Sequence, residues 1–321
     1  MIRTYTTPKG RLTPQATDAP DLDAIWIDLV DPTPDEIAQV SDRLGITIPD
    51  RADMDEIELS SRLYREKGAA VMTAVITARS DKAITNLAPV SFVLCGRQLV
   101  TVRFHDPRPF STFPDQAYRL ETPIKEAEDV LIGLLESIID RLADLLEAAA
   151  RDVDTLSRRI FRSAHSTKDP EDFQDVLQRI GAEGNTMSNI RDSLVTLERL
   201  AAFLGNVAGE RGCNADVRKR IKTLSGDARS LTDHLDFVSQ KLTFMLDASL
   251  GMINIAQNAT IKIFSVVAVI FLPPTLIASI YGMNFVHMPE LEWTYGYPMA
   301  LGAMVAAAIL PYLFFKYKGW L

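Results

Sequence analysis

The chain has 321 residues, a formal net charge of −8 and 47% hydrophobic residues. The negative charge argues against nucleic acid as a partner, because phosphate binding needs clusters of Lys and Arg, and it favours cations instead. The two cysteines, Cys95 and Cys213, lie far apart and match no metal-binding or redox spacing. Composition therefore excludes a nucleic-acid-binding protein and a disulfide-rich one.

Residues 1–125 are predicted to form an N-terminal cytoplasmic α/β domain. The segment Ile25–Leu29 alternates as a β-strand does. A capping box at Thr33 and Glu36 begins a helix, and Gly45 ends it. Further apolar and β-branched runs predict strands at 71–78, 90–95 and 99–104, the last two joined as a hairpin by a turn at 96–97.

Residues 126–212 are predicted to form a cytoplasmic helical hairpin. Apolar side chains recur at helical spacing as far as Phe161, and a break at Ser166–Pro170 precedes a second helix at about 171–206. Three glycines are expected to mark the turn that follows: Gly205, Gly209 and Gly212. The first helix carries four acidic residues on one face, which we interpret as a solvated face: Glu136, Asp140, Asp144 and Glu147.

A third helix is predicted to begin near Asn214, and its part from 213 to 260 is interpreted as a stalk. Its apolar residues recur seven apart: Leu224, Leu231, Val238, Met245 and Met252. The alternate heptad position holds Ala228, Leu235, Leu242 and Ala256, with Ser249 as the one polar exception. Such a pattern forms either the core of a bundle within one chain or a contact between subunits. We favour the contact between subunits, because a helix over 214–281 would be ~100 Å long at ~1.5 Å per residue.

Two apolar segments near the C-terminus predict a transmembrane hairpin. The first span is placed at 261–283 and the second at 298–316, with an extracytoplasmic loop at 284–297 and a basic tail at 317–321. Lysines flank the spans on the side opposite the loop: Lys262, Lys316 and Lys318. The loop carries two acidic residues, Glu290 and Glu292, and no Lys or Arg. The positive-inside rule therefore places both termini in the cytoplasm, and the membrane is expected to be a bacterial cytoplasmic (inner) membrane.

A single hairpin cannot enclose an aqueous path, so a pore needs several copies around an axis. The first span continues the heptad pattern, which predicts that it lines the pore. The predicted lining residues are Asn258, Ile261, Phe264, Ser265, Ala268, Leu272, Thr275 and Ser279, with Phe264 an alternative to Ser265. None is a carboxylate, which suits an ion that keeps its water shell, as Mg²⁺ does. The same residues also suit a membrane anchor that transports nothing, and Pro273-Pro274 fits a packed kink as well as a gating hinge.

A motif at the outer end of the first span favours transport over anchoring. It reads Tyr281-Gly282-Met283-Asn284-Phe285 and is followed by Met288-Pro289-Glu290-Leu291. In these residues the chain resembles the CorA family of magnesium channels, whose signature is Gly-Met-Asn between two C-terminal spans. The resemblance extends over the whole chain, from Trp26–Leu29 to Gly319–Leu321. It implies a CorA-like funnel: an α+β cytoplasmic domain, a long stalk helix and a two-helix transmembrane hairpin, assembled as a homopentamer.

The resemblance also implies roles for individual residues. The selectivity filter is formed by Gly282, Met283 and Asn284. In it, Asn284 holds hydrated Mg²⁺ through its amide oxygen; the alternative is that Asn284 only caps the helix. Glu290 and Glu292 either form an outer acidic ring or only keep the loop soluble. Asp227 is a candidate for a regulatory metal site, although Thr223 stands where some members of the family have an acidic residue.

The function expected from these features is a divalent metal channel that admits Mg²⁺, and also Co²⁺ with Ni²⁺ as a further candidate, and is gated by cytoplasmic Mg²⁺. Its expected partners are further copies of itself, the lipid bilayer and divalent cations, with no organic cofactor. A related zinc transporter of the ZntB type is an alternative, but such proteins typically have Ile in place of Met283 and lack the acidic loop. The four histidines form no catalytic constellation, so no enzymatic activity is predicted.

Overall fold

The computed structural model describes residues 1–8, 11–15, 24–56, 58–79, 85–119, 124–163, 170–284, 288–289 and 293–319. The chain divides into two compact units. The first comprises 1–159 with 175–245, and the second comprises 160–174 with 246–321.

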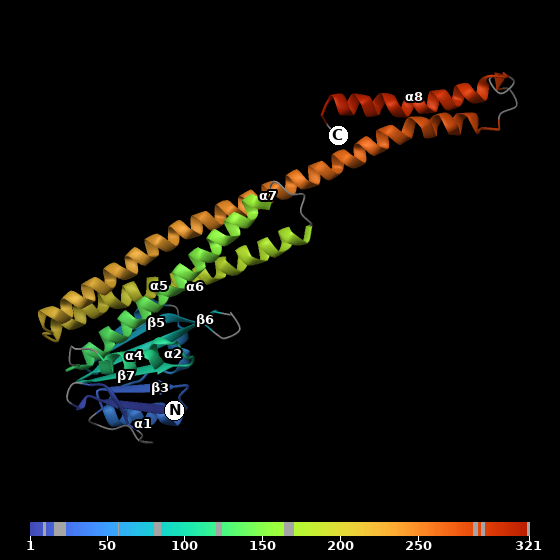
Figure 1. The fold of residues 1–321 in the computed structure, drawn as a ribbon. Helices are drawn as coiled ribbons and strands as arrows, with labels where there is room; N and C mark the ends of the chain where they lie inside the picture. Colours follow the sequence, from blue (N-terminus) through green and yellow to red (C-terminus); the bar gives the residue numbers. More distant parts are fainter. Residues whose placement is uncertain are drawn as a thin grey trace. The chain divides into compact units, whose positions relative to one another are not determined.

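The first unit contains a seven-stranded sheet in the order β2-β1-β3-β7-β6-β5-β4 (Figure 1). Its strands are β1 (Ile2–Thr6), β2 (Thr13–Gln15), β3 (Trp26–Val30), β4 (Leu63–Glu66), β5 (Ala69–Arg79), β6 (Thr85–Cys95) and β7 (Gln98–Arg103). The strands β3 and β7 are parallel, and every other neighbouring pair is antiparallel. The strands predicted to begin at 25, 71, 90 and 99 correspond to β3, β5, β6 and β7. At the predicted hairpin turn, Gly96 has a left-handed φ of 53°.

Helices cover both faces of this sheet (Figure 1). The helices are α1 (Pro34–Leu44), α2 (Arg51–Asp55), α3 (Leu59–Arg62), α4 (Pro109–Arg119), α5 (Ala127–Ser163), α6 (Pro170–Glu210) and α7 (Ala215–Tyr281). On one face, Val40 of α1 and Met54 of α2 share a core with the strands. On the other face, Phe92 of β6 belongs to a larger core with Leu135 of α5 and Leu197 of α6. The sheet is therefore buried on both sides.

The start and end of α1 follow the predicted signals. The Thr33 Oγ1 atom accepts a hydrogen bond from the Glu36 N–H at 3.3 Å, and the Glu36 carboxylate accepts one from the Thr33 N–H at 2.9 Å. Gly45 ends the helix in a left-handed conformation with φ 65°. The capping box and the terminating glycine are both confirmed.

The helices α5 and α6 occupy the region predicted as a helical hairpin. The second of them extends to Glu210, beyond the predicted end near 206, so Gly205 and Gly209 lie inside the helix. Of the three glycines expected in the turn, only Gly212 has a left-handed φ, of 66°. Two of the three were therefore placed wrongly, because apolar packing of α6 outweighs the low helix propensity of glycine.

The heptad pattern of α7 is a core face within one chain for most of its length. Leu224 and Leu235 are 2% and 0% exposed, and they belong to the same core as Leu142 of α5 and Leu197 of α6. Ser249, the polar exception in the pattern, is also buried. The interpretation of this stretch as a contact between subunits is therefore wrong, because α5 and α6 already supply the surface against which α7 packs.

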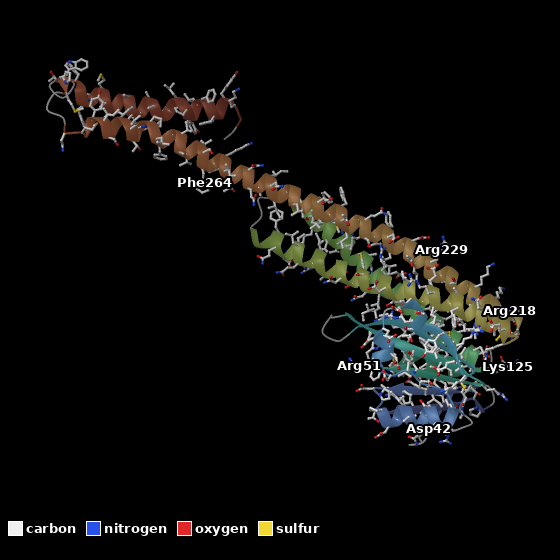
Figure 2. The ribbon with its side chains drawn as sticks, turned by 180° about the vertical axis from the view of Figure 1, so that it is seen from behind. Asp42, Arg51, Lys125, Arg218, Arg229 and Phe264 are labelled. Atoms are coloured by element: carbon white, nitrogen blue, oxygen red, sulfur yellow. The ribbon has the colours of Figure 1, made fainter. Side chains whose placement is uncertain are left out.

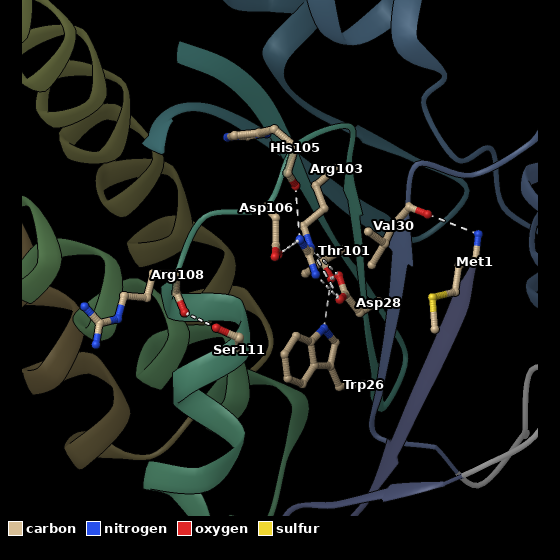
Figure 3. Close-up of polar contacts among 10 residues, drawn as sticks. All are labelled: Met1, Trp26, Asp28, Val30, Thr101, Arg103, His105, Asp106, Arg108 and Ser111. Atoms are coloured by element: carbon tan, nitrogen blue, oxygen red, sulfur yellow. Dashed lines mark hydrogen bonds and ion pairs between the residues drawn. The ribbon is translucent and has the colours of Figure 1, made fainter. Parts of the chain in front are cut away.

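A buried ion pair connects β3 to β7 (Figure 3). Arg103 and Asp28 have fully buried side chains, and Nη2 of the arginine lies 2.9 Å from Oδ2 of the aspartate. Thr101 donates a hydrogen bond to Asp28 at 2.8 Å and accepts one from the Trp26 indole N–H at 2.9 Å. The guanidinium also pairs with Asp106, just beyond β7. The Asp28 carboxylate thus has both a counter-charge and hydrogen-bond donors, which a buried charge requires.

In the second unit, α8 (Gly296–Tyr317) runs antiparallel to the C-terminal part of α7 (Figure 1). Both helices are long and apolar enough to cross a membrane, and their most apolar segments are almost entirely exposed in the single chain. These helices correspond to the spans predicted at 261–283 and 298–316.

Candidate functional site

The predicted filter residues stand at the C-terminal end of α7. The last helical residue is Tyr281, and the Gly282 N–H donates to the Ala278 carbonyl oxygen at 2.9 Å. A Cβ atom at Gly282 would lie 3.1 Å from that same oxygen, which is tighter than an ordinary van der Waals contact. The glycine therefore lets the last turn close without moving the backbone, and it places Met283 and Asn284 immediately beyond the helix.

Asn284 is exposed at this position. In the described parts of the chain, its side chain has no hydrogen-bond partner. Left-handed backbone occurs among the described non-glycine residues only at Asp31 and Lys67. Asn284 thus lacks the left-handed conformation of an asparagine that caps a helix.

The predicted lining residues are all exposed in the single chain. Ile261, Phe264 and Leu272, for example, are 61%, 70% and 66% exposed. The least exposed side of the span instead carries Val266, Ile270, Pro273 and Ile277. At about 100° per residue, the two sets are centred on roughly opposite sides of α7. The predicted lining is therefore a free surface of the hairpin, and a single chain does not bring its residues around a common path.

The paired prolines lie within α7 and do not end it. Pro273 and Pro274 are half-buried, on the less exposed side of the span. Because proline has no N–H, the carbonyl groups of Val269 and Ile270 lose their helical donors. Pro311 of α8 is half-buried as well. The prolines thus belong to the packed side of the hairpin rather than to the predicted lining.

Residues 254–265 of α7, here called the bare stretch, are exposed without exception. Four of them are large apolar residues with exposed fractions between 61% and 70%: Ile255, Ile261, Ile263 and Phe264. A helix gains most of its stability in proteins from packing. Lipid can cover the part of the bare stretch inside the predicted span, residues 261–265, whereas residues 254–260 need another covering, which the described residues of one chain do not supply.

Aromatic residues stand at both ends of α8. Their exposed fractions are 54% for Trp293, 69% for Tyr295, 77% for Tyr297 and 89% for Tyr317. Such residues are enriched where a span meets the membrane interface. The spacing of these aromatic residues around the second span was a usable signal for the membrane interface in the sequence. The acidic loop residues Glu290 and Glu292 lie outside the described residues, and the outer ring stays a prediction.

The candidate regulatory residue Asp227 lies near an acidic surface of α5. The pKa of Asp140 is raised above its usual value, first by partial burial and then by neighbouring carboxylates: those of Glu136, Asp144 and Asp227. Glu136 is compensated by Arg220, whose Nη2 lies 2.7 Å from its carboxylate. Among the described residues of one chain, no three His, Cys, Asp or Glu side chains are placed to hold a metal ion. The role of Asp227 stays a prediction.

Comparison with known proteins identifies the family. The family model described as CorA-like Mg²⁺ transporter protein matches residues 21–317. A magnesium transport protein CorA from Mannheimia succiniciproducens is 36% identical over 298 residues, which are 93% of this chain and 92% of that protein. A magnesium transport protein CorA from Haemophilus influenzae is 34% identical over 322 residues, 100% of both chains.

The fold comparison agrees with the sequence comparison. The complete structure of the CorA magnesium transporter from Methanocaldococcus jannaschii matches with a TM-score of 0.78 at 20% identity, over 100% of this chain and 99% of that one. At this identity the likeness concerns the fold alone. The family model and the relatives, however, each cover nearly the whole chain. The chain therefore belongs to the family of CorA-like Mg²⁺ transporter proteins.

Proposed function

We propose that this chain is a subunit of a channel that carries Mg²⁺ into the cytoplasm. The proposal depends above all on the exposed side chain of Asn284, which follows directly on a span whose predicted lining has no carboxylate. Mg²⁺ gives up its water reluctantly. A neutral amide oxygen accepts hydrogen bonds from the coordinated water and holds the ion weakly enough to release it. Relatives that are named magnesium transport proteins support the choice of ion.

The pore itself requires several copies of the chain, and the family resemblance implies five. The bare stretch supports such an assembly through Ile255, which is 70% exposed and precedes the predicted span, so that lipid does not cover it. A ring of copies would place the predicted lining residues around one path, with the Asn284 side chains at its outer mouth and Glu290 and Glu292 beyond them. The lysines that flank the two spans favour a cytoplasmic position for both termini.

Ion uptake into liposomes that contain the purified protein tests this function. We expect influx of Mg²⁺ and Co²⁺, and competition by Ni²⁺. These hydrated ions carry the same charge and would contact the same oxygen atoms at the outer mouth of the pore. Protein-free liposomes serve as the control, and an ion-sensitive dye in the lumen provides the measurement. Influx of Zn²⁺ without Mg²⁺ would support the zinc transporter instead, and the absence of any influx would support a membrane anchor.

We further propose that cytoplasmic Mg²⁺ closes the channel. Carboxylates near Asp227 repel one another, and a bound cation relieves that repulsion. Closure by this route requires the ion to bind the closed state more tightly than the open one. We expect influx to fall when Mg²⁺ is raised on the side of the membrane that holds the first unit, and we expect Asp227→Asn to weaken this inhibition. If the influx of the unaltered protein does not change when Mg²⁺ is raised on that side, gating by cytoplasmic Mg²⁺ is contradicted.

A further inference from the structure

One side of α7 carries a row of exposed cations, here called the basic flank: Arg218, Lys222 and Arg229. Within the described part of the chain, none of the three takes part in an ion pair. Figure 2 shows Arg218 and Arg229 along the same helix. At about 100° per residue, the three side chains point within about 40° of one another. They form a row of positive charges directed away from the core face of α7.

A second surface carries negative charge, here called the acidic flank: Asp227 of α7 with Asp140 and Asp144 of α5. All three are exposed. Among the residues that the structure describes, the one ion pair of Asp144 is a 3.9 Å contact with Arg141 of its own helix. Arg220, the cation of α7 on this side, already donates hydrogen bonds to another carboxylate of α5 at 3.0 and 2.7 Å. The acidic flank is thus left with uncompensated negative charge.

The two flanks share one level along α7 but lie on opposite sides of it. Asp227 lies between Lys222 and Arg229 in the helix. At about 100° per residue, a rotation of about 180–220° around the helix axis, counted in one sense, separates the side chains of the basic flank from that of Asp227. The basic flank and Asp227 therefore lie on roughly opposite sides of α7. In a cyclic ring, all copies stand at the same level along the axis, and each interface joins one side of a copy to the other side of the next. Opposite charges on opposite sides at one level meet that requirement.

We propose that, in the assembled ring, the basic flank of each copy docks against the acidic flank of the next copy. This inference rests on the ring assembly of the proposed function and adds which surfaces meet. It also assigns Asp140 and Asp144 to an interface, in place of the solvated face expected from the sequence. Complementary charges mainly fix partner and register, so the contact would set the head-to-tail direction of the ring.

Cross-linking of the full-length protein in membranes by a bismaleimide, whose spacer covers the length of an arginine–carboxylate contact, tests the docking, because a direct disulfide would need Cα atoms within about 7 Å. A chain that carries both Arg229→Cys and Asp144→Cys should give, with this reagent, a ladder of covalently linked chains beyond the dimer, because each copy joins two neighbours. Each single variant and the unaltered chain, which has only Cys95 and Cys213, should give no ladder. A native mass measurement in detergent accompanies each sample.

Charge reversal then separates proximity from electrostatic docking. In the cross-linking variant, Arg218→Glu with Lys222→Glu should slow ladder formation about tenfold, the size expected for one close charge pair across an interface. Adding Asp140→Lys should restore part of the rate, and raised salt should slow the starting variant. Because these variants replace Asp144, and one of them also Asp140, they change carboxylates near Asp227; the gating test therefore uses only the unaltered protein and Asp227→Asn.

The outcomes distinguish this inference from the proposed function. If the double cysteine variant forms no ladder while its native mass shows an oligomer, the docking of these flanks is overturned. The proposed channel function is not affected by that result. Ladder formation that is indifferent to charge reversal also overturns it. A native mass of a single chain, together with full ion influx, overturns the ring assembly on which the inference rests.

Discussion

Replacement of Asn284 by alanine is expected to remove most Mg²⁺ influx while the protein stays folded. The change deletes the amide oxygens that would accept hydrogen bonds from the water coordinated to the ion at the mouth of the pore. A hydrogen bond that involves a charged group is worth ~1.5–3 kcal/mol, and ~1.4 kcal/mol corresponds to a factor of ten in rate. We therefore expect influx to fall about tenfold or more. Influx into liposomes should be measured beside native mass and thermal unfolding, which should not change because Asn284 is exposed.

Two companion variants make the result specific. Asn206→Ala removes an exposed asparagine from α6 and should leave influx unchanged. Asn284→Asp should act differently, because a ring of carboxylates would hold the ion more tightly and compete with its water shell. Block by the ion should then increase and selectivity should change. Normal influx with normal selectivity in Asn284→Ala would refute the assignment of Asn284 as the ion site. The channel proposal would then be supported by the architecture alone.

Replacement of Arg103 by methionine is expected to destabilise the first unit by about 3–5 kcal/mol, because it leaves the Asp28 charge buried without its partner. Such a loss lowers the unfolding midpoint by roughly 6–20 °C for a unit of this size. The measurement is thermal unfolding of the full-length protein in detergent, followed by tryptophan fluorescence. The indole of Trp26 belongs to the network through Thr101, so its signal should report the change directly.

The matched control for Arg103 is Arg108→Met, which alters an exposed arginine just beyond β7 and should shift the midpoint little. The double variant Asp28→Leu with Arg103→Met removes both charges and should recover part of the lost stability, because replacing a whole buried pair by apolar side chains is often tolerated. A midpoint for Arg103→Met equal to that of Arg108→Met would show that the ion pair does not stabilise the sheet.

Signals that act between sequence neighbours predicted the local structure well. The capping box at Thr33 and the glycine at Gly45 depend on hydrogen bonds and backbone angles within a few residues, and both ends of α1 follow them. The strands beyond residue 70 were predicted from local signals as well, their apolar and β-branched runs and the turn at 96–97. The spans were predicted from length and composition, since a helix without charges over about 20 residues has few alternatives.

Partners that are distant in the sequence could not be predicted in this way. The heptads of α7 indicate that a stripe is buried, but they do not tell whether α5 and α6 or another subunit buries it. Asp28 and Arg103 are 75 residues apart, and they meet only because β3 and β7 pair in parallel. The lining set shares one face of α7, yet a path along it depends on copies that one chain does not contain.

A newly made subunit carries residues 254–260, the part of the bare stretch before the predicted span, uncovered until it meets other copies. Ile255, which is 70% exposed, precedes the predicted span and so has no lipid to shield it. Cells continuously remove proteins with unsatisfied apolar surface through chaperones and proteases, and the stability of an obligate oligomer depends on the concentration of its subunits. Subunits made slowly should therefore be degraded before they assemble, and the amount of mature protein should rise more steeply than its rate of synthesis.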